Sequence, residues 1–343
     1  MQTKKSKISM KGAIYMVAAL FMVFSGLNVS AQNVAARGHQ NARRLVTKSL
    51  LQDRIEFLCD SLCEGRGSGQ PGGAVAAIWL QREFERIGLM KLGDSYGHAA
   101  PLGNGKYGRN IIGMLPGSKV TSRDRYIIVG AHYDHLGKLD GKIYPGADAN
   151  ASGTVALLSL AEMLSEYKDS GKTHNHNIIF VAFDAKESNM AGSKALWRMI
   201  EKEQLIDPQS GNTITKEKIA FMANIDQVGC TMSPLESGRK DYIIMLGNHT
   251  LKPSSREMIG YCNSAYAIDM DIDLTYYGSK NFTKMFYRLS DQRVFIDNGI
   301  PAVLFTSGIT MNNNKTRDTA QTIDTEILRK RIFLMYHWLE KMM

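Results

Sequence analysis

The segment 178–193, which reads IIFVAFDAKESNMAGS, constrains the fold of this chain more than any other. Its first six residues are apolar and rich in β-branched and aromatic types, a pattern typical of a short strand buried on both faces. The sequence then turns polar at Asp184, and a helical pattern resumes a few residues later. A strand, an acidic turn and a helix in this order place side chains at the carboxyl end of a sheet, where α/β proteins bind ligands. The turn residues Asp184, Lys186 and Glu187 are therefore candidates for a functional site.

The same alternation of strands and helices continues over the rest of the chain. Further strands are expected at residues 110–115, 126–131, 220–225, 242–246 and 301–306. Helical patterns run through residues 51–62, 77–87, 154–164 and 323–339. There is no internal repeat and no low-complexity linker. The pattern predicts one α/β domain of three layers with a mostly parallel mixed sheet, covering residues 45–343 after a lead-in of residues 32–44.

Residues 1–31 have the features of a secretory signal peptide. Four lysines precede the apolar run 13–24, and the small residues Val29, Ser30 and Ala31 follow it. The run is much shorter than the roughly 20 residues that span a bilayer. The sequence therefore predicts export to the periplasm or the medium, with no membrane span once the leader is cleaved.

Composition narrows the class of protein further. The formal net charge is +9, but part of the excess lies in the leader and no basic block stands out, so we do not expect a nucleic-acid partner. The four cysteines define neither a disulfide scaffold nor a zinc finger, and their pairing stays open. The glycine-rich segment 64–73 lacks the Gly-Lys-Ser/Thr sequence of a phosphate-binding loop.

Five short motifs occur along the chain, each at an expected strand end or in the loop beyond it. They read GAHYDHLG, GADANASG, FDAKES, NIDQVG and IPAVLFTSG followed by DT. In type and order they resemble motifs of the co-catalytic zinc aminopeptidases, the group that includes bacterial leucyl aminopeptidase, glutamate carboxypeptidase and glutaminyl cyclase. The resemblance covers roughly residues 50–340 and implies a zinc-aminopeptidase-like fold.

The resemblance also implies a site with two zinc ions that share a bridging carboxylate and a water, about 3.5–4 Å apart. Three of the implied ligands are retained, namely His132, Glu187 and Asp226. Asp134 matches the residue that orients the histidine from behind. Asp291 is assigned a similar supporting position.

Three central positions depart from the family pattern. Ala149 stands where the bridging aspartate belongs, and Asp148 is one residue away from it. Lys186 occupies the position of the general-base glutamate. Asn314 occupies the position of the last histidine ligand. We predict that the Lys186 ammonium lies among Glu187, Asp226 and Asp148 in place of part of the zinc charge.

Charge counting predicts that a two-zinc site is absent. Only Glu187 and Asp226 remain as carboxylates, and Lys186 adds a positive charge. Unit charges 4 Å apart interact by about 4 kcal/mol at an effective dielectric constant near 20, so a lysine facing one Zn²⁺ would be repelled by about 8 kcal/mol. The expected cofactor is therefore none or weakly bound zinc. Binding of a single metal ion is left open, because His132 and Asp226 are half of the ligands of one of the two implied zinc positions.

Two functions follow from these residues. The first is a peptide-binding pseudopeptidase that uses the family's cleft for a peptide or peptide-like small ligand. The alternative is an active metallo-aminopeptidase with one metal or an unusual ligand set. A single-zinc glutaminyl cyclase fits poorly, because only Glu187 of its implied ligands survives. Outside the site, His337 is expected at the surface of the last helix.

Overall fold

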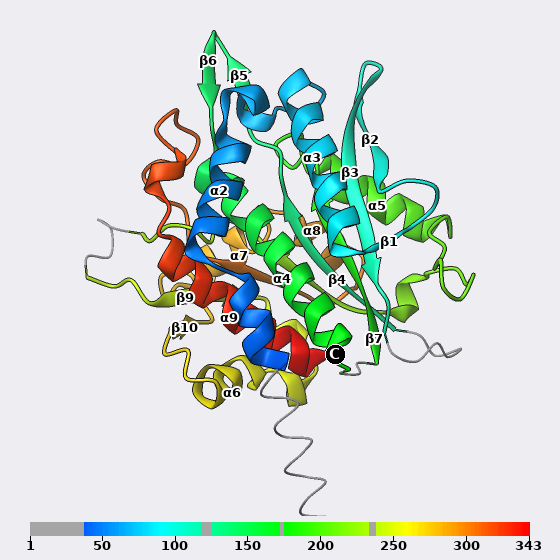
Figure 1. Cartoon of the computed structure of the whole chain (residues 1–343), viewed down its shortest axis with the longest axis vertical. Helices are drawn as coiled ribbons and strands as arrows, with labels where there is room; N and C mark the ends of the chain where they lie inside the picture. Colours follow the sequence, from blue (N-terminus) through cyan, green and yellow to red (C-terminus); the bar gives the residue numbers. More distant parts are fainter. Residues whose placement is uncertain (1–37, 118–124, 172–174, 233–237) are drawn as a thin grey trace, which may run out of the picture.

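The computed structural model describes residues 38–117, 125–171, 175–232 and 238–343 (Figure 1). The predicted leader, residues 1–31, and the start of the lead-in lie outside the described residues. Within the described ranges, no helix has the length and apolar character needed to cross a membrane. All four cysteines lie in these ranges and are free thiols.

A nine-stranded mixed sheet forms the centre of the molecule. Its strands are β1 (Met90–Lys91), β2 (Gly97–Gly103), β3 (Lys106–Leu115), β4 (Arg125–His132), β7 (His176–Phe183), β8 (Ile219–Ile225), β9 (Tyr242–Leu246), β10 (Asp271–Asp273) and β11 (Ala302–Thr306). They are arranged in the order β1-β3-β7-β4-β8-β11-β9-β10, with β2 paired to β3 outside this path. A separate hairpin is formed by β5 (Gly137–Leu139) and β6 (Lys142–Tyr144).

The four central strands β7, β4, β8 and β11 are parallel to one another, and antiparallel pairs flank them on both sides. Since parallel strands end at the same edge of a sheet, the turns after β4, β7 and β8 are neighbours in space. The predicted mostly parallel mixed sheet is confirmed, and its central register brings the motif-bearing turns together.

Helices cover both faces of the sheet. They are α2 (Lys48–Cys59), α3 (Pro71–Ile87), α4 (Ser152–Asp169), α5 (Ala191–Glu201), α6 (Met258–Ala265), α7 (Lys280–Phe286), α8 (Gln292–Asp297) and α9 (Thr325–Met342). Along β4, Ile127 and Val129 pack against the layer of α2, α3, α4 and α9, whereas Tyr126 and Ile128 pack against the layer of α5 and α8. This alternation is the two-residue period of a strand buried on both faces, and it confirms the predicted three layers.

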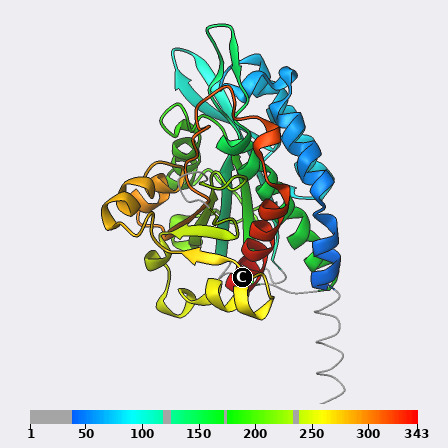
Figure 2. The ribbon, with the colours of Figure 1, turned by 90° about the vertical axis from the view of Figure 1, so that its left-hand side faces the viewer.

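The helix ends follow from local sequence. Asp324 caps α9 by accepting hydrogen bonds from the backbone N–H groups of Glu326 and Ile327. Pro71 stands in the first turn of α3, and Gly88 ends that helix with a φ of 82°. Residues 38–45 are also helical and pack Ala42 into the main core, on the same side of the sheet as α9 (Figure 2).

Candidate functional site

The retained residues stand at the carboxyl ends of three adjacent strands. His132 is the last residue of β4, Asp226 follows β8, and Lys186 and Glu187 lie in the turn after β7. His132 is fully buried, and its Nε2 lies 3.2 Å from Asp226 Oδ1. The parallel register therefore joins two motifs that are 94 residues apart in the sequence.

His132 and Asp226 form a charged pair in the folded protein. Burial opposes the charge on His132, but the carboxylates of Asp226 and Asp134 together outweigh it and raise the pKa of the imidazole to about 10. Burial likewise opposes the charge on Asp226, yet His132 and Lys186 hold the pKa of that carboxyl well below its usual range. The pair thus carries a proton on the imidazole at neutral pH.

Asp134 holds the turn after β7 against the turn after β4. Its two carboxylate oxygens accept hydrogen bonds from the backbone N–H groups of Lys186 and Glu187, each at 3.0 Å. Asp134 Oδ1 also lies 3.5 Å from Nδ1 of His132. The residue assigned to orient the histidine therefore also fixes the backbone of the Lys186–Glu187 turn.

The Lys186 ammonium lies within this acidic group. Its Nζ is 2.9 Å from Glu187 Oε1, and the lysine side chain is 17% exposed. Burial alone would lower the pKa of Lys186, but Asp226, Glu187 and Asp134 raise it above the ordinary lysine value. The position that matches a general base thus holds a stable cation.

Asp148 is bound to other partners than this cation. Its Oδ1 accepts hydrogen bonds from the backbone N–H groups of Gly229 and Cys230, at 2.8 and 3.2 Å, and from the Ser152 hydroxyl at 3.1 Å. The prediction that Asp148 joins the partners of Lys186 is therefore wrong. Residues 147–151 form a π-helical turn rather than the expected extended loop, and from this turn the Asp148 side chain tethers the segment after β8. Burial raises the pKa of Asp148 to about 7.

Two residues that the sequence reasoning did not single out position the loop around Ala149. Asn150 donates through Nδ2 to the backbone oxygens of His132 and Ile225, at 3.2 and 2.9 Å. Asp318 accepts from the backbone N–H groups of Asp148 and Ala149, at 3.0 and 3.1 Å. Asn150 lies in the motif GADANASG and Asp318 in the final DT, so membership of these motifs was the sequence feature that could have identified both residues.

The remaining predicted positions lie around this centre in different ways. Asn314 is exposed, whereas the neighbouring Asn313 accepts a hydrogen bond at 2.9 Å from Nε2 of Gln227, the residue after Asp226. Asp291 is fully buried, and burial raises its pKa to about 7 although the His132 charge acts in the opposite direction. Asn313 is therefore the asparagine whose side chain reaches the end of β8.

These residues do not fit a pair of zinc ions. Ala149 offers no donor atom at the bridging position, and the Asp148 carboxylate is bound to backbone N–H groups. Glu187 and Asp226 are instead neutralised by Lys186 and His132. Two dications placed here would replace favourable ion pairs with the repulsion of two existing cations.

A cleft of about 900 Å³ opens beside this centre, between α3 and the β2–β3 hairpin. Tyr133 and Asp184 line its wall next to the turns after β4 and β7. The Asp184 carboxylate is fixed by the Ser68 hydroxyl at 2.6 Å and by the Arg109 backbone N–H at 2.6 Å. The wall that adjoins the Lys186 turn is therefore rigidly positioned.

Comparisons with known proteins identify the family of the chain. The profile of Peptidase family M28 matches residues 110–339. The chain is 28% identical over 175 residues to leucine aminopeptidase 1 of Sclerotinia sclerotiorum, a match covering 50% of this chain and 41% of that protein. It is 25% identical over 252 residues to leucine aminopeptidase 1 of Aspergillus oryzae, covering 71% and 57%. The chain thus spans about half the length of these curated relatives.

Solved structures share the fold. The LapA aminopeptidase of Legionella pneumophila superposes with a TM-score of 0.67 at 15% identity, covering 91% of this chain and 75% of that one. The glutaminyl cyclase of Porphyromonas gingivalis superposes with a TM-score of 0.59 at 17% identity, covering 87% and 99%. These likenesses show the fold. The family profile, which spans well over half of the chain, establishes that the chain belongs to Peptidase family M28.

Proposed function

We propose that this chain is an exported, peptide-binding member of the family whose two-metal hydrolytic centre has been dismantled. One observation carries the proposal: the Lys186 ammonium stands 2.9 Å from Glu187 Oε1 in the position of the general base. A protonated lysine cannot accept a proton from water. Loss of a general base alone typically slows a reaction by about 10²–10⁴-fold.

The missing bridge strengthens this reading. In two-metal hydrolysis a shared carboxylate and water align the attacking oxygen between the ions. Ala149 cannot supply that carboxylate, and Asp148 is held on Gly229 and Cys230 instead. The substitutions at the bridging position and at the general-base position therefore both lower the expected rate of hydrolysis.

The proposed ligand is a peptide or a peptide-like small molecule. The curated relatives are named leucine aminopeptidases, so the fold is one that accommodates peptide termini. The cleft of about 900 Å³ beside Tyr133 and Asp184 lies within the size range of about 300–1,000 Å³ that is usual for small-molecule sites. The ion-paired turn after β7 would form one side of the binding surface.

An active metallo-aminopeptidase with one metal is the second candidate. It is favoured by the close approach of His132 and Asp226, which are both metal-ligand types at one strand edge. Two protein ligands hold zinc weakly, since catalytic zinc sites ordinarily use three. This candidate therefore predicts slow turnover that a chelator abolishes.

The two candidates are separated by hydrolysis of a panel of fluorogenic aminoacyl substrates, measured with and without zinc and a chelator. The purified protein should turn over none of them, while peptide binding is followed by titration calorimetry. A restoration variant combines Ala149→Asp and Lys186→Glu with either Asn313→His or Asn314→His. It should gain zinc-dependent turnover. Lys202→Glu, which makes the same charge change on an exposed residue, should gain none. Chelator-sensitive turnover by the unmodified protein would establish the enzyme instead.

A further inference from the structure

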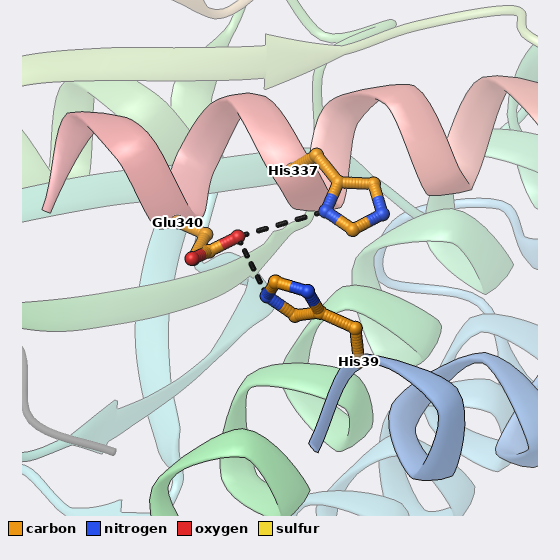
Figure 3. A group of neighbouring side chains, drawn as sticks. All are labelled: His39, His337 and Glu340. Carbon is orange, nitrogen blue, oxygen red and sulfur yellow. Dashed lines mark ion pairs between the residues drawn. The ribbon is translucent and has the colours of Figure 1, made fainter. Parts of the chain in front are cut away.

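A second group of potential ligands lies at the opposite edge of the sheet. His39 comes from the helical segment 38–45, and His337 and Glu340 come from α9 (Figure 3). The end of α9 adjoins the start of β7, where His176 contacts the backbone oxygen of Met343. This cluster is therefore separate from the centre around Lys186, which lies at the carboxyl ends of the strands.

The ligand atoms of the cluster all lie within 4.8 Å of one another, and two of the distances between them are close to those in a tetrahedral metal site. Nε2 of His39 lies 3.0 Å and Nδ1 of His337 lies 3.6 Å from the same oxygen, Oε2 of Glu340. Zinc bonds to nitrogen and oxygen are about 2.0–2.1 Å long, so neighbouring ligands of a tetrahedral ion are about 3.3 Å apart. His337 and Glu340 are three residues apart on one helix, which places them on one face.

The histidine nitrogens are buried without hydrogen bonds. Among the described residues, neither ring nitrogen of the fully buried His337 has a hydrogen-bond partner. Nε2 of His39 also makes none, although it lies within 3.0 Å of the carboxylate. Buried polar groups in native proteins are almost always satisfied, so these open nitrogens, two of which face Oε2 of Glu340, need an explanation. A shared ion supplies it for the two nitrogens nearest Glu340.

The surroundings hold the ligands in place. The ring of Tyr266 stacks on His337 with centroids 3.5 Å apart, and Tyr167 stacks on His39 at 5.5 Å. The Tyr167 hydroxyl donates to the other carboxylate oxygen, Oε1 of Glu340, at 3.0 Å. The Tyr266 hydroxyl donates to Oε2 at 3.3 Å, so this oxygen faces both histidines and one phenol while the stacked rings hold the imidazole planes.

The charge state of the cluster suits a cation. A neutral imidazole offers a lone pair to a cation, and Glu340 supplies a negatively charged carboxylate beside the two rings. Lys341 lies 3.5 Å from Oε1, the oxygen that neither histidine approaches most closely, and its side chain is 34% exposed. It can turn into solvent when an ion binds. The expectation that His337 lies at the surface is wrong, because α9 is buried along this face.

We propose that His39, His337 and Glu340 bind a divalent transition-metal ion, with zinc the best match, and that this ion fastens the N-terminal helical segment to α9. Two imidazoles and a carboxylate are the ligand types zinc uses, and water completes the tetrahedron. The role is structural, since the site lies at the edge of the sheet away from the cleft.

The test is titration of the purified, metal-free protein with Co²⁺, which reports tetrahedral coordination through intense visible absorption, together with equilibrium dialysis against Zn²⁺. One ion per chain should bind to the unmodified protein, to the surface control His249→Gln and to Asp226→Asn, which alters the other centre. His39→Gln and Glu340→Gln should each weaken binding by at least about tenfold. His39 lies on a peripheral helix, so its variant should remain folded.

X-ray absorption at the zinc edge of the unmodified protein gives a readout that needs no variant: two imidazoles and oxygen ligands should surround the ion. Three results would overturn the proposal. They are no stoichiometric binding, binding unchanged in His39→Gln, and binding lost only in Asp226→Asn. The last would place the ion at the carboxyl ends of the strands and contradict the dismantled centre as well.

Discussion

Replacing Lys186 by methionine should lower the free energy of unfolding by about 2–3 kcal/mol. With 2.9 Å between Nζ and Glu187 Oε1, the Coulomb energy is about 6 kcal/mol at an effective dielectric constant near 20. Removing one partner of a fully buried pair costs about 3–5 kcal/mol, and exposed pairs contribute about 0–1 kcal/mol. The side chains of Lys186 and Glu187 are 17% and 25% exposed, so the expected loss lies between these limits.

The assay is urea unfolding at pH 7 of the unmodified protein, Lys186→Met and the control Lys202→Met, whose lysine is exposed. If the ammonium replaces a metal charge, added zinc should stabilise Lys186→Met more than the unmodified protein. Zinc bound at His39 would stabilise both proteins equally, so its effect cancels when the zinc-induced gains in unfolding free energy are compared. A loss below about 0.5 kcal/mol, as for an ordinary surface substitution, would refute the claim that carboxylates depend on this cation.

Three further outcomes are expected. The restoration variant should bind two zinc ions more than the unmodified protein by elemental analysis, whereas Lys186→Glu alone should add no turnover. The folded-state pKa of His132 is raised to about 10, so the protonated imidazole stabilises the fold fully below about pH 6.5 and this stabilisation is lost as the pH rises to about 10. The free energy of unfolding should therefore fall between pH 7 and pH 10. In Asp226→Asn the fall should be smaller. Asn150→Ala should cost about 2–4 kcal/mol by leaving buried backbone groups without partners, against almost no change for the exposed Asn212→Ala in the same urea assay.

The strand pattern predicted the central sheet well because its signal is local. Each of β4, β7 and β8 is an apolar run followed by a polar turn, and parallel pairing then requires that these turns meet. The edge strands were harder to predict. β2 and β10 have several partly exposed positions, so neither shows a sustained apolar run.

Side-chain direction and distant contacts were not predictable in the same way. The identity of Asp148 is visible in the sequence, but whether it faces Lys186 or Gly229 depends on the path of its loop. His337 is buried because Tyr266 stacks on its ring and the segment around His39 packs on α9 from the other end of the sequence. A helical period shows which residues share a face, not which face another element will cover.

The position of β11 determines the order in which this sheet can be completed. β11 lies between β8 and β9, so β9 and β10 join the rest of the sheet only through a strand that follows them in the sequence. Until residues 302–306 are available, the edges of β8 and β9 that β11 later covers remain unpaired. The same strand ends at Thr306, whose hydroxyl donates to the backbone oxygen of Gln227, next to Asp226. Three of the nine strands and one wall of the candidate site are therefore assembled after nearly the whole chain is synthesised. A chain that must cross a membrane before folding would keep its export-competent state longer with this strand order.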